Sequence, residues 1–335
     1  MRVLDFGELY YRQVNCFVSN IIADRSPVVR INGIDKNAGF SVVYTALGSR
    51  FDIAQVAHEA FGFNEYYASD ADSIESLPIA EAMRYVRGQA IKEGKVPSEY
   101  QSLVEKVREN KNLYGAVVWQ EKGDKNAKTL YLPGPASQLD ETQVAAFNKV
   151  SGGDFYATTE FNDCGFMQIQ LALEEELEQT RGKLAGLIDR YETVVTDDQY
   201  VYDALKCLFP QADKIIFIDQ YLISQGRKIK AKSVALQESS VLNRLYPLNK
   251  TNLEDLFENT DIRLPRRSSW DVTDSGIAGG LGFFAETSWR NMAAGRLEML
   301  EELATEETVS LCSAEAFGLN RGKEKVKTVL ESAAE

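Results

Sequence analysis

The sequence predicts an α/β protein in which a mostly helical N-terminal part precedes alternating strands and helices around a mainly parallel sheet. Three observations support this prediction. Before Tyr114, apolar residues recur at the three- and four-residue spacing of amphipathic helices. After Tyr114, short runs rich in Val, Ile and Thr alternate with helical segments. The order of those elements then recurs near the C-terminus.

The N-terminal part contains three expected helices. Residues 53–61 have an amphipathic pattern that includes His58, for which we expect a half-buried packing role. Residues 79–91 follow Pro78, and proline suits a first helical turn because its missing N–H group costs nothing there. A third helix is expected over residues 98–110.

The middle of the chain alternates between short extended runs and helices. Strands are expected at residues 116–119, 129–132, 154–159, 193–196 and 214–218. The polar residues 121–128 predict a loop or hairpin, and the Leu- and Glu-rich residues 167–192 predict one long helix with a solvated acidic face. Another helix is expected to run through Leu205. Such alternation is typical of a parallel sheet covered by helices.

A similar order follows in the last part of the chain. Strands are expected at residues 233–236, 271–273 and 308–311, and helices at residues 242–257, at 289–303 and from 316 onward. The Asp-Cys-Gly of residues 163–165 is echoed by the Asp-Ser-Gly of residues 274–276. A duplicated unit of about one hundred residues fits this order.

Length and charge narrow the classes of function. A chain of 335 residues is long for one core, so two or three domains are expected. The net charge of −13 repels nucleic acid and anionic lipid, and no nucleic-acid partner is expected. The sequence has no apolar run of membrane-spanning length and no basic, apolar start of a secretory signal. We therefore expect a cytoplasmic protein without a direct membrane span.

Cysteine and histidine usage restricts metal and nucleophile chemistry. The four cysteines, Cys16, Cys164, Cys207 and Cys312, lie far apart without a CxxC pair, which argues against a disulfide framework and a zinc site of neighbouring cysteines. The chain has one histidine, so a histidine-rich metal centre is excluded and a Ser-His-Asp triad would depend on His58 alone.

Two segments keep the spacing of a ferredoxin-type cluster loop but not its ligands. Such loops place cysteines at C-x2-C-x2-C-x3-C and follow them with proline. The first set at this spacing is Cys16, Ser19, Ile22 and Ser26 before Pro27, and the second is Tyr67, Asp70, Ser73 and Leu77 before Pro78. Seven of these eight ligand positions therefore lack cysteine.

Together with the helical segment after Pro78, with Asn112 to Gly115 and with the duplicated unit, these motifs resemble the iron–sulfur subunits of the heterodisulfide reductase and anaerobic glycerol-3-phosphate and glycolate dehydrogenase type. That family joins two 4Fe–4S ferredoxin-type motifs to two cysteine-rich CCG domains. The CCG ligand positions correspond here to Pro135, Asp163, Cys164, Asp198 and Val201 in the first copy, and to Ser240, Asp274, Ser275, Cys312 and Glu315 in the second. The glycine-rich run from Asp274 to Gly280 is the most specific match.

The resemblance implies a degenerate helical ferredoxin-like domain at residues 1–115, a first CCG-like α/β repeat at 116–229 and a second at 230–335. Family members pass electrons between a dehydrogenase and an acceptor. One cysteine per site cannot hold a cluster, which needs about four soft ligands. We therefore expect no cofactor, metal or catalytic residue, and apolar replacements such as Ile22, Leu77, Pro135 and Val201 to fill the space by packing.

The polar replacements leave two interpretations open. In the first, Asp274, Ser275, Cys312 and Glu315 form a hard-metal or small-ligand site. In the second, the acidic and hydroxyl replacements serve as loop and cap residues; they are Asp163, Asp198, Ser240, Asp274, Ser275 and Glu315. The glycines of residues 276–282 either bind an anion at the following helix or are an inherited turn.

The leading hypothesis is a non-catalytic structural or regulatory subunit of a redox complex. Its partner would be a dehydrogenase or an active iron–sulfur paralogue. The alternatives are an enzyme or ligand-binding protein of changed chemistry, and a stand-alone binding module that forms a homo-oligomer.

Overall fold

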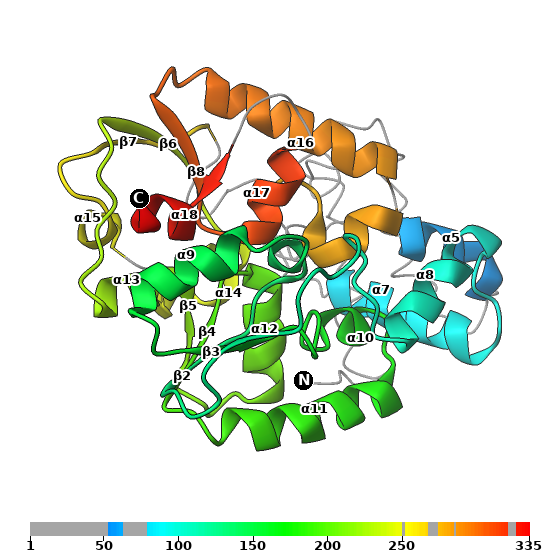
Figure 1. Ribbon diagram of the computed structural model, residues 1–335. Coiled ribbons are helices and arrows are strands. Elements are labelled where there is room, and N and C mark those ends of the chain that lie inside the picture. The colour runs from blue at the N-terminus through cyan, green and yellow to red at the C-terminus, as the bar shows by residue number, and fades with distance from the viewer. Residues whose placement is uncertain (1–52, 63–78, 250–251, 267–273, 285, 321–325) are drawn as a thin grey trace.

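The computed structural model describes residues 53–62, 79–249, 252–266, 274–284, 286–320 and 326–335 (Figure 1). The described chain is a mixed α/β protein with two sheets of mostly parallel strands. Strand 271–273 and all eight ferredoxin-type positions lie outside the described residues. These positions are Cys16, Ser19, Ile22, Ser26, Tyr67, Asp70, Ser73 and Leu77.

Three N-terminal helices, α5 (Ile53–Gly62), α7 (Ile79–Lys92) and α8 (Ser98–Arg108), are present as predicted. The ring of Phe61 stacks on that of Tyr100 with centroids 5.5 Å apart, and both contact Phe284 of the C-terminal half. The expectation for His58 is wrong. Its side chain is 67% exposed on the outer face of α5 and lies 2.9 Å from the Glu99 carboxylate.

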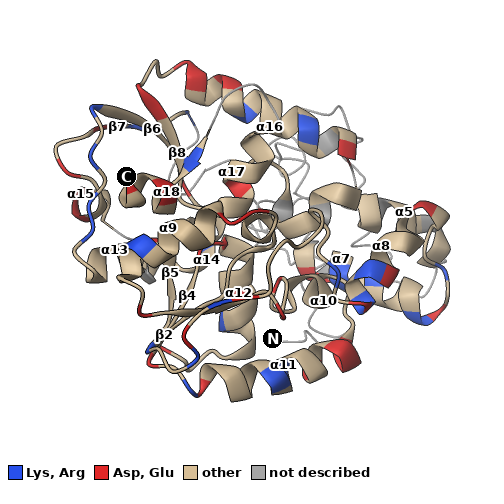
Figure 2. Ribbon diagram, viewed as in Figure 1, with Lys and Arg blue, Asp and Glu red and all other residues tan. Residues whose placement is uncertain are grey.

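The first sheet has the strand order β1 (Glu121–Gly123), β3 (Tyr156–Thr158), β2 (Thr129–Tyr131), β4 (Thr193–Thr196) and β5 (Ile215–Phe217). All pairs are parallel except β1 with β3. The helical elements of this half are η2 (Pro135–Gln138), α9 (Thr142–Ser151), α10 (Phe166–Gln170), α11 (Glu174–Ile188), α12 (Gln199–Leu208) and α13 (Ile218–Ser224). The outer face of α11 carries the acidic residues in solvent, as the sequence predicted (Figure 2).

The second sheet has the order β7 (Asp261–Arg263), β6 (Ser233–Gln237), β8 (Glu307–Ser310) and β9 (Lys327–Thr328), and every pair is parallel. The helical elements of this half are α14 (Ser240–Leu245), η3 (Pro247–Asn249), α15 (Leu253–Leu256), η5 (Ala278–Phe284), α16 (Glu286–Glu301), α17 (Ser313–Leu319) and α18 (Val329–Ala334).

The two sheets have the same connection order. In each, the chain passes from an inner strand (β2 or β6) to the strand on one side of it (β3 or β7), crosses to the other side (β4 or β8) and continues outward (β5 or β9); the first sheet has β1 as an additional edge strand beyond β3. The reversal lies between β2 and β4 in the first sheet and between β6 and β8 in the second. Ligand sites in open α/β sheets lie at the carboxyl ends of strands beside such a reversal. The domain boundaries at residues 115 and 229 remain predictions.

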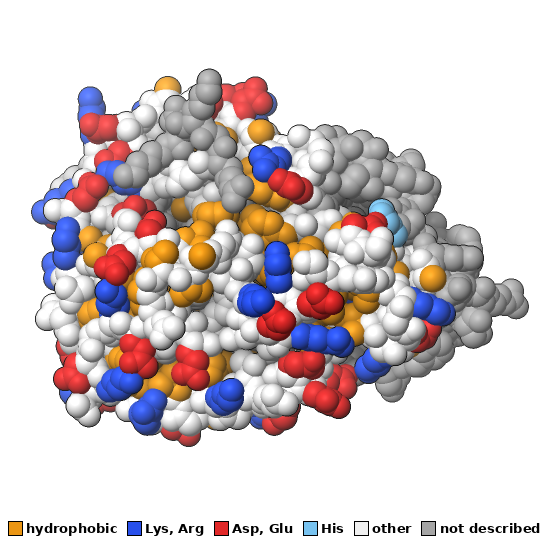
Figure 3. All heavy atoms as spheres, turned by 45° about the vertical axis from the view of Figure 1, so that its right-hand side comes forward, with side chains coloured by type: hydrophobic (Ala, Val, Ile, Leu, Met, Phe, Trp, Pro, Cys, Tyr) orange, Lys and Arg blue, Asp and Glu red, His pale blue; other side chains and the backbone are white. Residues whose placement is uncertain are grey.

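One apolar core joins the two halves. It contains Leu130 and Val194 from the first sheet and Val234 and Val309 from the second, all fully buried. The described part of the face seen in Figure 3 carries charges of both signs among apolar side chains. Among the described residues, no helix combines the length and apolar character needed to cross a membrane.

Several predicted elements are wrong. The first described strand lies at Glu121–Gly123, inside the segment predicted as a loop or hairpin. Residues 116–119, which were predicted as a strand, form none, and Val117 and Val118 are 40% and 55% exposed. The helix predicted over 167–192 is two helices, α10 and α11, because Ala172 between them has a φ of +52°. Gly88 of α7 approaches Ala172 closely, so the break makes room for α7.

The C-terminal helix was also predicted incorrectly. The segment after residue 316 contains the rest of α17, strand β9 and helix α18. The two-residue strand β9 is too short to show a periodic pattern, and its place is set by pairing with β8. The helix predicted within 242–257 is divided among α14, η3 and α15.

Candidate functional site

The carboxyl ends of β4, β6 and β8 contribute side chains from both halves to one largely buried group. Each strand leads directly into a helix, so the residues at these turns meet where the sheets face each other (Figure 1). We call this group the interface cluster. Its members are Asp198, Gln199, Tyr200, Ser240, Asp274, Ser275, Cys312 and Glu315.

Asp198 begins α12 as its N-cap residue. Its Oδ1 accepts hydrogen bonds from the backbone N–H groups of Tyr200 (2.8 Å) and Val201 (3.3 Å), which supports the cap interpretation of the acidic replacements. Burial, together with the neighbouring Asp197 carboxylate, raises the pKa of Asp198 to about 7. The Val201 side chain is fully buried in the core. Pro135 is also buried.

Asp197, beside the cap, accepts three hydrogen bonds in the interior. The donors are Tyr131 Oη (2.9 Å) and Ser137 Oγ (2.5 Å) to Oδ2, and the backbone N–H of Gly134 (2.8 Å) to Oδ1. Burial raises the pKa of this carboxyl, while the donors act in the opposite direction. A side chain at Gly134 would collide with Asp198, because an added Cβ would lie 2.4 Å from the Asp198 Cβ.

Glu315 is a fully buried carboxyl of the interface cluster that contacts both halves. Its Oε1 accepts hydrogen bonds from Gln199 Nε2 (3.1 Å) and Tyr200 Oη (3.0 Å) of the first half. Its Oε2 accepts the backbone N–H of Ser275 (2.5 Å). Burial, reinforced by the carboxylate of Asp274, raises the pKa of Glu315 to about 8.

Gln199 connects this carboxyl to two other turns of the second half. Its Oε1 accepts hydrogen bonds from Ser239 Oγ (2.7 Å) and the backbone N–H of Val241 (3.1 Å). The backbone N–H of Gln199 donates a hydrogen bond to Cys312 Sγ (3.3 Å). No sequence pattern singles out Gln199 or Tyr200, because Glu315, the carboxyl that both contact, lies more than one hundred residues away.

Asp274 completes the cluster at its partly buried edge. Its Oδ2 accepts hydrogen bonds from Ser240 Oγ (3.0 Å) and Tyr200 Oη (3.4 Å), and its Oδ1 accepts the N–H of Gly276 (3.2 Å). Asp163 makes the matching local bond in the first half, to the N–H of Gly165 at 3.0 Å. In both Asp-x-Gly turns, the Asp carboxylate therefore accepts a hydrogen bond from the N–H of the glycine two residues later. Burial raises the pKa of Asp163 to about 6.

An iron–sulfur cluster does not fit these residues. Cys164 and Cys312 are fully buried, and burial together with nearby carboxylates raises the pKa of each thiol well above its ordinary value. Cluster ligation requires thiolates, usually four of them. Among the described residues, no group of three or more His, Cys, Asp or Glu side chains is arranged to hold a metal ion. The hard-metal interpretation of Asp274, Cys312 and Glu315 therefore lacks a geometric basis.

The glycine-rich turn packs against the first half instead of opening toward an anion. Gly279 has a φ of +63°, and a Cβ there would lie 2.4 Å from Phe166 Cε1 and 2.8 Å from Tyr200 Cγ. Gly276 is similarly close to Met292 and Trp289. These glycines allow η5 to approach α10 and α12, which accounts for the run without a bound ligand.

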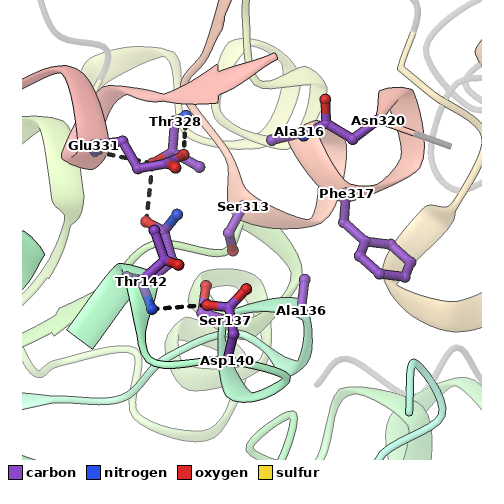
Figure 4. A pocket seen from close by; sticks show the side chains of 11 residues that line it. Ala136, Ser137, Asp140, Thr142, Ser313, Ala316, Phe317, Asn320, Thr328 and Glu331 are labelled. Carbon is purple, nitrogen blue, oxygen red and sulfur yellow. Dashed lines mark hydrogen bonds between the residues drawn. The ribbon is translucent and has the colours of Figure 1, made fainter. Parts of the chain in front are cut away.

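A pocket of about 260 Å³ adjoins the interface cluster (Figure 4). Its wall includes Ser137 of η2 and Ser313 of α17, so both halves contribute to it. The backbone N–H of Ser313 donates to the carbonyl of Asp197 (2.9 Å), and Ser137 Oγ donates to the carboxylate of the same residue. The interface cluster and the pocket therefore share Asp197 as a supporting residue.

Comparisons with other proteins do not assign the chain to a group. No protein-family model matches the sequence, and no curated protein matches it.

Proposed function

We propose that the chain is a non-catalytic structural or regulatory subunit of an electron-transfer complex of the heterodisulfide reductase type. In this proposal, side chains that bind one another have replaced the cluster ligands. The observation that carries it is Glu315, whose two oxygens accept hydrogen bonds from Gln199, Tyr200 and Ser275 at a former ligand position. Gln199 and Tyr200 belong to the first half and Glu315 and Ser275 to the second, so these contacts join the two halves directly.

The engagement of the carboxyls favours a scaffold over an enzyme of changed chemistry. A general acid or base must reach a substrate within hydrogen-bonding distance. Asp163, Asp198 and Glu315 are buried and accept backbone N–H groups or side chains of the protein itself. Their raised pKa values follow from this burial, which alone does not identify a catalytic group.

The first prediction from this proposal concerns metal content. Protein purified anaerobically from its native source should contain neither stoichiometric iron nor acid-labile sulfide, because each CCG-like half offers one buried thiol. The measurement is elemental analysis together with the visible absorption spectrum. A broad cluster absorption with stoichiometric iron and sulfide would refute the proposal, including its assignment of the N-terminal motifs that carry Cys16.

The partner is tested separately, by gentle purification from the native source. We propose that a dehydrogenase or an active iron–sulfur paralogue in the cytoplasm binds this chain, since the retained architecture would allow it to dock where such a paralogue docks. Stable co-migration with a redox subunit would support a role in a complex. A lone monomer or homodimer on sizing would favour the stand-alone binding module instead.

A further inference from the structure

We propose that the pocket between η2, α9, α17 and β9 binds a small neutral polyhydroxylated molecule, such as a free sugar or a cyclic polyol. This site goes beyond the scaffold role and does not depend on it. The pocket lies at the carboxyl ends of β2, β8 and β9, where open α/β sheets place their ligand sites.

The size of the pocket fits a compact ligand. A volume of about 260 Å³ is close to the space of roughly nine water molecules, at about 30 Å³ each in the liquid. Ligand pockets usually measure roughly 300–1,000 Å³, so this one lies just below the usual range. A single sugar ring or a short polyol matches it better than a nucleotide or a peptide.

One hydroxyl in the wall has no role within the described protein. Ser313 is 5% exposed, and its Oγ has no hydrogen-bond partner among the described residues. Figure 4 shows this hydroxyl pointing toward Ser137 and Ala136 on the facing element. A buried polar atom without a partner costs roughly 1–3 kcal/mol, and a ligand hydroxyl in the pocket would satisfy it.

The other polar groups of the wall are held in place but keep spare capacity. Thr328 Oγ1 donates to Gln143 Oε1 (2.9 Å), which leaves the Gln143 amide NH2 without a partner among the described residues. Glu331 Oε2 accepts the N–H of Thr328 (2.8 Å) and Asp140 Oδ1 accepts the N–H of Thr142 (2.8 Å), so each carboxylate has a second oxygen for a ligand hydroxyl. This mixture of donors and acceptors suits a molecule with several hydroxyl groups.

Charge and depth select a neutral ligand. Two carboxylates and no basic side chain occur among the described lining residues, so an anion is repelled. The deeper groups, Ser137 and Ser313, are neutral, and the carboxylate behind them, Asp197, already accepts three donors. An ammonium group would find no available carboxylate at that depth. The half-buried ring of Phe317 offers an apolar surface to the C–H groups of a sugar ring.

The test is to titrate the full chain with five small molecules and to measure binding by calorimetry and ligand-detected NMR. Glucose, ribose and myo-inositol are the neutral probes, glucosamine is the cationic probe and gluconate is the anionic probe. We expect saturable binding of at least one neutral probe and weaker binding of gluconate. Failure of all three neutral probes to bind, or binding of glucosamine alone, would overturn the proposal.

Two variants make the test specific to this pocket. Ser313→Ala should lower the affinity for the neutral probe about 3–10-fold, which corresponds to the loss of one hydrogen bond. It should not lower the stability of the free protein, because Ser313 Oγ has no hydrogen-bond partner among the described residues. Ala136→Leu should abolish binding by filling the pocket from η2, where Ala136 is only partly buried. Unchanged affinity in both variants would place the ligand elsewhere and refute the site. The iron analysis and this titration can fail independently.

Discussion

Replacing Gly279 by alanine is expected to lower the free energy of unfolding by about 2–5 kcal/mol. Two effects contribute. The backbone has a φ of +63° and a ψ of 24°, which costs an alanine about 1–2 kcal/mol relative to glycine. The added Cβ would lie 2.4 Å from Phe166 Cε1, so η5 would have to move away from α10 and α12. The decrease in the free energy of unfolding is measured by urea unfolding monitored by circular dichroism.

Gly152 provides a matched control for the backbone effect. It has a φ of +64° and a ψ of 22°, nearly the values of Gly279, but an added Cβ there meets nothing within 4 Å. Gly152→Ala should therefore cost only about 1–2 kcal/mol. Equal losses in the two variants would contradict the close packing of the glycine-rich turn against the first half, and with it our interpretation of residues 276–282.

The sequence was sufficient to predict the α/β class because its signals are local. Runs such as residues 193–196 and 233–236 combine β-branched residues with flanking polar turns, and the structure places β4 and β6 there. The cap interpretation of Asp198 depended on an equally local rule, since a carboxylate one residue before a helix accepts its first N–H groups.

The incorrect predictions depend on tertiary contacts. Strand β1 has the sequence Glu-Lys-Gly, which has little strand propensity, and forms by backbone pairing with β3. His58 lies on an amphipathic helix but on the face turned toward Glu99 and solvent. A single sequence carries no local signal for either arrangement.

The candidate site was predictable in its positions but not in its bonds. Asp198, Asp274, Cys312 and Glu315 were singled out from the sequence as expected positions of a CCG-type motif, and the structure brings them into one group. The residues that join them, Gln199 and Tyr200, belong to no motif, and their role depends on how the halves dock. The pocket is likewise lined by hydroxyl, amide, carboxylate and apolar side chains whose spacing in the sequence carries no signal.

Raising the pH should destabilise the protein, and Glu315 should be the main cause. Its pKa is about 8 in the folded chain against 4.5 for an ordinary glutamate, so over this interval the folded state binds a proton that the unfolded state has released. The stability that this proton provides is fully present below pH 4.5 and is lost as the pH rises through about 8. Asp198 acts in the same direction, between 3.8 and about 7.

The expected loss between a pH of about 6 and a pH of about 8.5 is on the order of 2–4 kcal/mol, measured by urea unfolding at both values. Glu315→Gln supplies a neutral side chain of the same size, so its stability should change less over the same interval, although one of its N–H groups will face a donor. Glu298→Gln, at an exposed position of α16, is the control and should keep the full dependence.

A stability that is constant or rises over this interval would contradict the burial of Glu315 between the two halves. A full pH dependence in Glu315→Gln would assign the effect to other carboxyls, such as Asp198 and Asp163. The expected result follows from where the carboxyl lies. An ionised Glu315 remains enclosed by Gln199, Tyr200 and Ser275, with no basic side chain among its hydrogen-bond partners, and three neutral donors must stabilise a charge that water would otherwise solvate. The same contacts that join the two halves therefore make their docking sensitive to pH.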